Sequence, residues 1–254
     1  MDLFKSSNPV LSEKKLTGSG LDAALLFENS MTLKGTLQKF GFLFLMVLGS
    51  SYFSWKEYTD HGNVQPLILI GAFGGLVVAF IIIFKREWAG YLAPLYALLQ
   101  GLFIGAISAN YNAAFAEVAP NIVVTAVGLT FAVVIAMYLL YSFRIIQVTQ
   151  KLRSVIMIAT GGIFVFYLMS WVMQLFGMPV FPFLHEGGTV GIIFSLVVVG
   201  VASLNLLLDF DMIEKGVASG QPKYMEWYGA FGLLVTIVWL YLEILRLLSK
   251  LYKR

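Results

Sequence analysis

The chain has 254 residues, of which 59% are hydrophobic and only 12% are charged, and its mean hydropathy is +0.84. About a quarter of the residues of a soluble domain are charged, so this composition excludes a single water-soluble core and indicates a protein of the lipid bilayer. The net charge of +3 is too small and too scattered for nucleic-acid binding. The absence of cysteine excludes disulfide and thiol chemistry.

The apolar runs are close to twenty residues long, which predicts membrane-spanning helices rather than the alternating ten-residue strands of a barrel. We expect an all-α polytopic membrane protein. Its seven transmembrane helices should lie at residues 37–55, 66–84, 88–109, 121–143, 154–176, 189–209 and 229–251. Residues 1–35 would then be a cytoplasmic tail and residues 36–254 the transmembrane domain. The tail lacks the apolar core and cleavage site of a signal peptide, so we expect no cleavage.

Basic residues are distributed unequally among the connectors between these runs. The connectors after the second, fourth and sixth runs hold Lys85, Arg86, Arg144, Lys151, Arg153, Lys215 and Lys223. The alternate connectors hold only Lys56. Because cytoplasmic loops are enriched in Lys and Arg, the amino terminus should be cytoplasmic. Seven crossings would leave Arg246, Lys250, Lys253 and Arg254 outside, so either the last run crosses despite its charge or one segment is re-entrant.

Acidic residues interrupt the last two apolar runs. Asp209 closes the sixth run and Glu243 lies inside the seventh. An ionisable group in lipid is costly, and it therefore indicates a functional site. Arg246 and Lys250 follow Glu243 by three and seven residues and share its helix face. A structural ion pair that reaches toward the interface is therefore the alternative.

Enzymatic chemistry has little support in the sequence. His61 and His185 lie in connectors without the spacing of a metal cage. An intramembrane aspartyl protease would pair carboxylates on two helices, as Asp209 and Glu243 could. Such proteases carry Gly-x-Gly-Asp, whereas Glu243 follows Leu-Tyr-Leu. We therefore expect no enzyme and no cofactor.

Four short segments carry a resemblance to a known family. Residues 208–213 (LDFDMI) and residues 239–248 (WLYLEILRLL) resemble the Bax inhibitor-1 family, and residues 7–11 (SNPVL) and 31–32 (MT) are similar to its bacterial branch. The resemblance implies a seven-helix bundle with the last helix in the centre. It also implies a pH-sensitive calcium leak, with membrane lipid and Ca²⁺ as partners, and the absence of a targeting signal favours a bacterial plasma membrane.

The resemblance further implies roles for individual residues. Asp209 and Glu243 would pair, line the ion pathway, sense pH and supply ligands to Ca²⁺. Arg86, or Lys85 in its place, would latch Asp209 from the end of the second helix. Supporting roles would fall to Asn205, Asp211, Arg246 and Gln100. Two carboxylates in contact cannot both ionise cheaply, so a proton taken up at low pH would close the pathway and repulsion at higher pH would open it.

The chain departs from this pattern at three points. Glu243 stands where Asp is usual, and Gln100 stands where many relatives carry an acid. The two carboxylates are 243 − 209 = 34 residues apart. If the last helix began at Glu226, Glu243 would lie about 25 Å along it, too deep to meet Asp209 at the cytoplasmic edge. Pairing therefore requires residues 217–234 to form a partly separate segment.

A second function remains open. The protein could be a non-conducting regulator that binds other membrane proteins, such as a membrane protease or a stress-response partner. Gly71, Gly74 and Gly75 in the second run would then provide a ridge of small residues on which another helix could pack. Such residues more often pack helices within one bundle.

Overall fold

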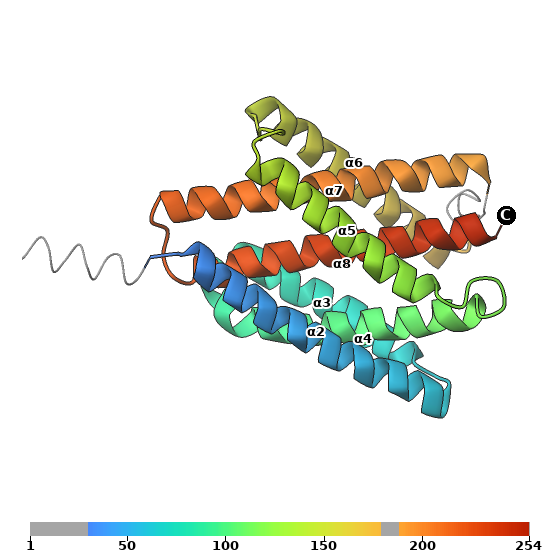
Figure 1. Ribbon diagram of the computed structural model, residues 1–254. Helices are drawn as coiled ribbons and strands as arrows, with labels where there is room; N and C mark the ends of the chain where they lie inside the picture. Colours follow the sequence, from blue (N-terminus) through green and yellow to red (C-terminus); the bar gives the residue numbers. More distant parts are fainter. Residues whose placement is uncertain (1–29, 179–187, 254) are drawn as a thin grey trace, which may run out of the picture.

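The computed structural model describes residues 30–178 and 188–253, and within these ranges the regular elements are helices. In chain order they are α2 (Leu33–His61), α3 (Gln65–Phe84), the short 3-10 helix η1 (Arg86–Trp88), α4 (Ala89–Ala114), α5 (Ile122–Ser142), α6 (Gln150–Leu175), α7 (Thr189–Ala218) and α8 (Met225–Tyr252). The long helices form one elongated bundle (Figure 1). The predicted all-α fold is confirmed.

Local signals set the helix ends. Thr32 caps α2 by accepting a hydrogen bond from the Gly35 amide at 3.0 Å. Gly62 ends the same helix in the left-handed conformation, with φ of 72°. Pro66 lies in the first turn of α3, where its missing N–H costs nothing. Helix α2 therefore starts inside the segment predicted to be a tail.

Six helical segments of the described chain are long and apolar enough to cross a membrane, namely α3, η1 with α4, α5, α6, α7 and α8. The seventh long helix, α2, falls outside this group; it carries Lys34, Lys39 and Lys56, with further charges near its end. Its 29 residues extend about 43 Å and pack against α4 and α8. The chain is therefore a polytopic membrane protein.

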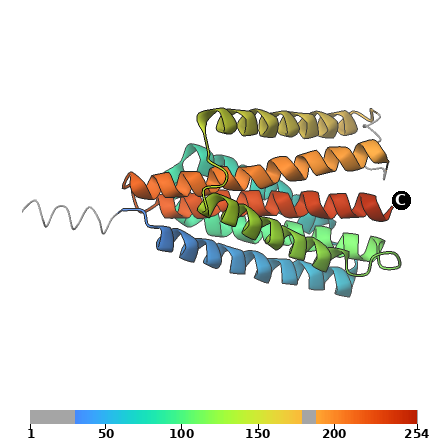
Figure 2. The same ribbon diagram turned by 45° about the horizontal axis from the view of Figure 1, so that its top comes forward.

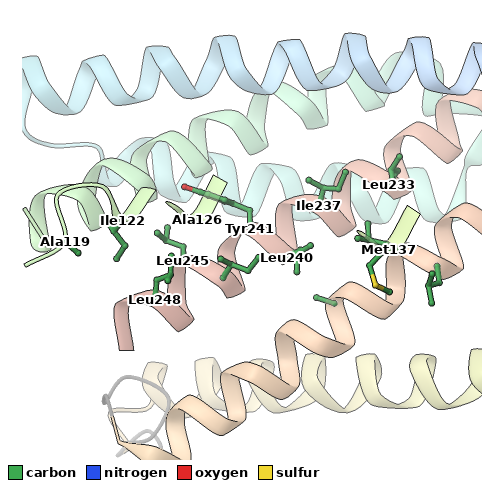
Figure 3. Close-up of a cluster of buried hydrophobic side chains, with 14 of the residues drawn as sticks. Ala119, Ile122, Ala126, Met137, Leu233, Ile237, Leu240, Tyr241, Leu245 and Leu248 are labelled. Atoms are coloured by element: carbon green, nitrogen blue, oxygen red, sulfur yellow. The ribbon is translucent and has the colours of Figure 1, made fainter. Parts of the chain in front are cut away.

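Helix α8 lies in the centre of the bundle (Figure 2). It packs against α2, α4, α5 and α7, and it is buried on both sides. One side joins a cluster with α5 and α7 that includes Leu240 and Leu245 (Figure 3). The other joins a cluster with α2 and α4 that includes Phe231 and Leu234. Buried residues lie on both sides of α8 along most of its length, and the predicted central position is confirmed.

The end of α7 differs from the prediction. The helix continues from Asp209 for 218 − 209 = 9 further residues, to Ala218. The charged residues there are compatible with a helix because they form ion pairs, such as Lys215 with Asp211 one turn away at 2.8 Å. The connector shrinks to residues 219–224, and residues 217–234 form no separate segment.

Helix α6 lies at the edge of the bundle, where it packs mainly against α7 (Figure 2). Most of its apolar surface is exposed, and Met157, Ile158 and Phe164 are each more than half exposed. In water such a face would be unstable, but in a bilayer it contacts lipid tails.

Candidate functional site

Asp209 lies on α7 where this helix meets α8. Its Oδ2 atom is buried and has no hydrogen-bond partner in the part of the chain that the structure describes. On α8 it faces Gly232, where an added Cβ would lie 3.9 Å from Oδ1, and Thr236. The Thr236 hydroxyl itself donates to the Gly232 carbonyl at 3.3 Å. An ionised carboxylate is costly in such surroundings, so the position favours a proton or a bound cation on Asp209.

Asn205 precedes Asp209 by one turn of α7. Its Nδ2 donates to Thr160 Oγ1 on α6 at 2.8 Å and to the Val201 carbonyl at 2.9 Å. Both amide hydrogens are therefore engaged, and Asn205 joins α6 to α7.

Glu243 has very different surroundings. Its side chain is 2% exposed and accepts hydrogen bonds from Arg246 at 2.8 and 3.0 Å. Tyr167 of α6 and Trp239 donate to it at 3.2 and 3.3 Å. The Arg246 guanidinium lies 4.9 Å from the centre of the Tyr167 ring and donates to its hydroxyl at 2.7 Å. The ion pair that was the alternative interpretation of Glu243 is present.

The structure does not bring Asp209 and Glu243 together. Gly232, which faces Asp209, precedes Glu243 by 243 − 232 = 11 residues, or about 16 Å along α8. The reason is that α8 starts at Met225 and runs unbroken, so Glu243 lies too deep. The expected carboxylate contact is absent, and so is the shared pair of Ca²⁺ ligands. Within the described residues, no group of three or more His, Asp or Glu side chains could hold a metal ion.

The expected latch is not formed either. Lys85 and Arg86 follow the end of α3 and are exposed. The Arg86 guanidinium lies over the Tyr228 ring of α8, 5.2 Å from its centre. Among the described residues, Asp209 receives no hydrogen bond or ion pair from either basic side chain. Since Tyr228 precedes Gly232 by one turn, Arg86 lies near the level of Asp209 but packs on the aromatic ring.

Asp211 is a paired carboxylate two residues from Asp209. It accepts hydrogen bonds from Arg153 of α6 at 2.5 Å and from Lys215 at 2.8 Å. Asp209 and Asp211 therefore give a comparison within one helix between a carboxylate without charged partners and one with two.

Gln100 is buried on α4 against α3. A Cβ added at Gly75 would lie 2.4 Å from its Nε2 atom, so the glycine is required for this close approach. Gln100 thus contributes to packing between α3 and α4.

Glu226 is a buried charge that the sequence analysis missed. It is the second residue of α8, and it accepts hydrogen bonds from the Thr32 amide at 2.9 Å and the Thr32 hydroxyl at 2.7 Å. It also pairs with Lys39 and, at 3.1 Å, with Lys223. An acid in the first turn of a helix is a recognisable signal, because it interacts favourably with the helix dipole.

Lys250 is the second charge whose burial was not foreseen. Its Nζ donates to the Gly191 carbonyl at 3.1 Å and to Ser195 Oγ at 2.8 Å, both on α7, and the residue is 1% exposed. The basic residues near the end of α8 are thus partly internal. The count of basic residues near the carboxyl end of α8 therefore argues less strongly against a membrane crossing by this helix than the sequence alone suggests.

Polar contacts at seven-residue intervals hold α6 to the bundle. Arg153 pairs with Asp211, Thr160 accepts from Asn205, and Tyr167 donates to Glu243. A seven-residue spacing places side chains on nearly the same helix face. One face of α6 therefore meets α7 and α8 through polar groups.

Comparisons with curated proteins and with solved structures gave no match. The family described as Bax inhibitor 1 like matches residues 7–253, which is almost the full length. The match includes the central helix, Asp209 and Asp211 on α7, and Glu243 on α8. The chain therefore belongs to the Bax inhibitor 1 like family.

Proposed function

We propose that the protein is a slow, pH-sensitive calcium leak of a bacterial plasma membrane and that Asp209 is its pH-sensing carboxylate. The observation that carries this proposal is the buried Oδ2 of Asp209, which has no hydrogen-bond partner among the described residues. Membership of the family supports a multi-pass membrane protein. The leak and its pH dependence are the proposed part.

The charge on Asp209 governs the contact between α7 and α8 in this proposal. Protonated, the side chain is neutral and packs against Gly232 and Thr236 at little cost. Ionised, it needs water or a cation in the interface. Ca²⁺ prefers oxygen ligands, and a carboxylate with neighbouring hydroxyl and carbonyl oxygens offers a weak, transient site for a passing ion. Flux should therefore be low at acidic pH and rise as Asp209 loses its proton.

Glu243 belongs to a separate step in this mechanism. Arg246 already neutralises it, so an ion moving along α8 would meet a closed ion pair. The Arg246 side chain is 34% exposed and can leave the carboxylate without crossing the core. In this proposal the described arrangement is the closed state.

The test is Ca²⁺ uptake into vesicles that contain only the purified protein, measured from acidic to mildly alkaline pH. Asp209→Asn should flatten the pH response because position 209 can no longer change charge. Asp211→Asn is the matched control, since it removes a carboxylate from the same helix that already has two basic partners. It should retain the pH response. Vesicles that do not take up Ca²⁺, or an Asp209→Asn protein with the normal pH response, would refute the proposal.

The alternative of a non-conducting regulator loses its support in the sequence. Gly71, Gly74 and Gly75 all face α4: an added Cβ would lie 2.6 Å from the Leu99 carbonyl, 3.3 Å from the Leu99 side chain and 2.4 Å from Gln100, respectively. The ridge is used inside the bundle and is not free for another protein. Flux in pure vesicles separates the two functions, because a regulator needs its partner.

A further inference from the structure

A cavity of about 450 Å³ lies between α2, α4, α5 and α8. On α8 it is lined by Leu234, Ile237, Val238 and Tyr241. Tyr241 and Glu243 are two residues apart, so they point to opposite sides of the helix. Glu243 lies on the same face of α8 as Gly232, which faces Asp209, because the two residues are eleven positions or about three turns apart. The cavity therefore lies on the opposite side of α8 from Asp209, and none of the proposed leak residues lines it.

The lining is hydrocarbon apart from the Trp55 indole and a few hydroxyl groups, four of which have hydrogen-bond partners within the bundle. Ser108 and Tyr241 bond to each other at 2.6 Å, Thr130 donates to the Ala126 carbonyl at 2.7 Å, and Ser51 donates to the Leu48 carbonyl at 2.9 Å. Water needs several polar partners to remain in a cavity, and these hydroxyls offer few. The volume lies within the range of small-molecule sites, which are also mainly apolar. The favoured occupant is therefore a hydrocarbon.

The cavity opens sideways between α2 and α5. Leu48 and Tyr52 on α2 and Val127 on α5 line it and are 48%, 72% and 39% exposed, respectively. An edge-to-face contact between Phe44 and Phe131, with ring centres 5.8 Å apart, closes one end of this opening. α5 is a membrane-spanning helix by length and composition, so the opening faces the hydrocarbon of the bilayer.

We propose that this cavity is a binding site for one acyl chain of a membrane phospholipid, which enters between α2 and α5. The lining on α2 runs from Phe44 to Trp55, 55 − 44 = 11 residues or about 16 Å, so the site is a long slot. A slot of this length suits a linear chain better than a compact molecule. Phospholipid chains are also the hydrocarbon present at the opening.

Photolabelling can test the proposal. The full-length protein is placed in phosphatidylcholine vesicles in which a fraction of the lipid carries a photoreactive group along its acyl chain, and labelled residues are mapped by mass spectrometry. Ile237 and Tyr241 are 8% and 7% exposed, so bulk lipid does not reach them except through the cavity. Labelling of these two residues is expected. Labelling confined to exposed residues would overturn the proposal.

Paired variants separate the cavity from general lipid contact. Val127→Trp fills the opening and should reduce labelling of Tyr241 at least several-fold. Val124→Trp is the control, because Val124 is 72% exposed on the same helix and is not part of the lining. It should leave the labelling unchanged. Unchanged labelling in Val127→Trp would also overturn the proposal.

A second pair on α2 covers the case in which Val127→Trp fails to fold. Leu48→Trp acts at the opening, and Leu45→Trp is its control on the 67% exposed lipid face of the same helix. Equal Tyr241 labelling in this pair would count against the site. A loss confined to Leu48→Trp would support it.

Discussion

Glu243 is buried and Asp209 is partly buried with a buried Oδ2 atom; the two lie on neighbouring helices, and their partners decide what each can do. Glu243 accepts hydrogen bonds from Arg246, Tyr167 and Trp239, and such a set stabilises the charged form. Asp209 has an oxygen without a partner among the described residues. One side chain is thus mainly a structural ion pair, and the other is the candidate sensor.

Stability measurements distinguish a structural ion pair from an exposed one. Removing one partner of a fully buried pair costs about 3–5 kcal/mol, and because Arg246 is 34% exposed we expect Glu243→Gln to cost only about 1–3 kcal/mol. The matched control is Glu214→Gln. Glu214 pairs with Arg144 and also accepts a hydrogen bond from Tyr141; with side chains 45% and 62% exposed, the ion pair should contribute less than about 1 kcal/mol. Thermal unfolding followed by tryptophan fluorescence measures both, and equal losses would contradict the assignment.

We also expect Asp209 and Glu243 to contribute independently to the free energy of unfolding. Sites more than about 10 Å apart without shared partners usually give additive changes in stability, within about 0.5 kcal/mol. The double variant Asp209→Asn, Glu243→Gln should therefore change the free energy of unfolding by the sum of the single changes. A larger coupling would mean that the two side chains meet in a state other than the one described.

At the scale of helices, the start of α2 and the start of α8 are tightly joined. A Cβ added at Gly35 would lie 2.3 Å from Glu226 Oε1, so a larger residue must displace this buried carboxylate from Thr32 and Lys39. Gly35→Ala should lower the melting temperature. Gly41→Ala in the same helix meets nothing within 4 Å and should leave it unchanged or raise it, because alanine favours helix. Similar effects of the two substitutions would contradict this junction.

The helices were predictable from sequence because each is a long apolar run, and a bilayer leaves few other structures for such runs. The end of α7 was not predictable from sequence, because hydropathy marks where contact with lipid stops and not where the helix stops. Asp211 and Lys215 continue the helix by pairing one turn apart. The pair of Glu243 with Arg246 could be predicted from its three-residue spacing. The contacts of Glu243 with Tyr167 and of Glu226 with Thr32 could not, because they depend on how distant helices pack.

At the scale of the whole molecule, the course of α8 bears on the alternatives for the carboxyl terminus. The helix runs without a break for 28 residues, about 42 Å, so it is not re-entrant. Its first turn binds the start of α2 through Glu226, and Met31 donates to the Gln221 carbonyl in the α7–α8 connector. The starts of α2 and α8 thus lie at one end of the bundle, and the carboxyl end lies at the other (Figure 1).

This arrangement gives a topology that labelling can check. Because the α7–α8 connector contacts the start of α2, Ser219 and residue 31 should lie on one side of the membrane, and Asn63, after the end of α2, on the other. The positive-inside rule places Ser219 and Thr149 in the cytoplasm and Asn63 outside. The same rule places Glu186 outside, at a position beyond the described residues.

The chain has no cysteine, so single-cysteine variants can be labelled with an impermeant thiol reagent without background. Asn63→Cys should react in intact cells, and Ser219→Cys and Thr149→Cys should react only after the cells are opened. Reaction of Asn63→Cys only in opened cells would reverse the orientation and leave the bundle unchanged. Reaction of Asn63→Cys and Ser219→Cys from the same side would contradict the bundle, because α2 would then not cross the membrane between them.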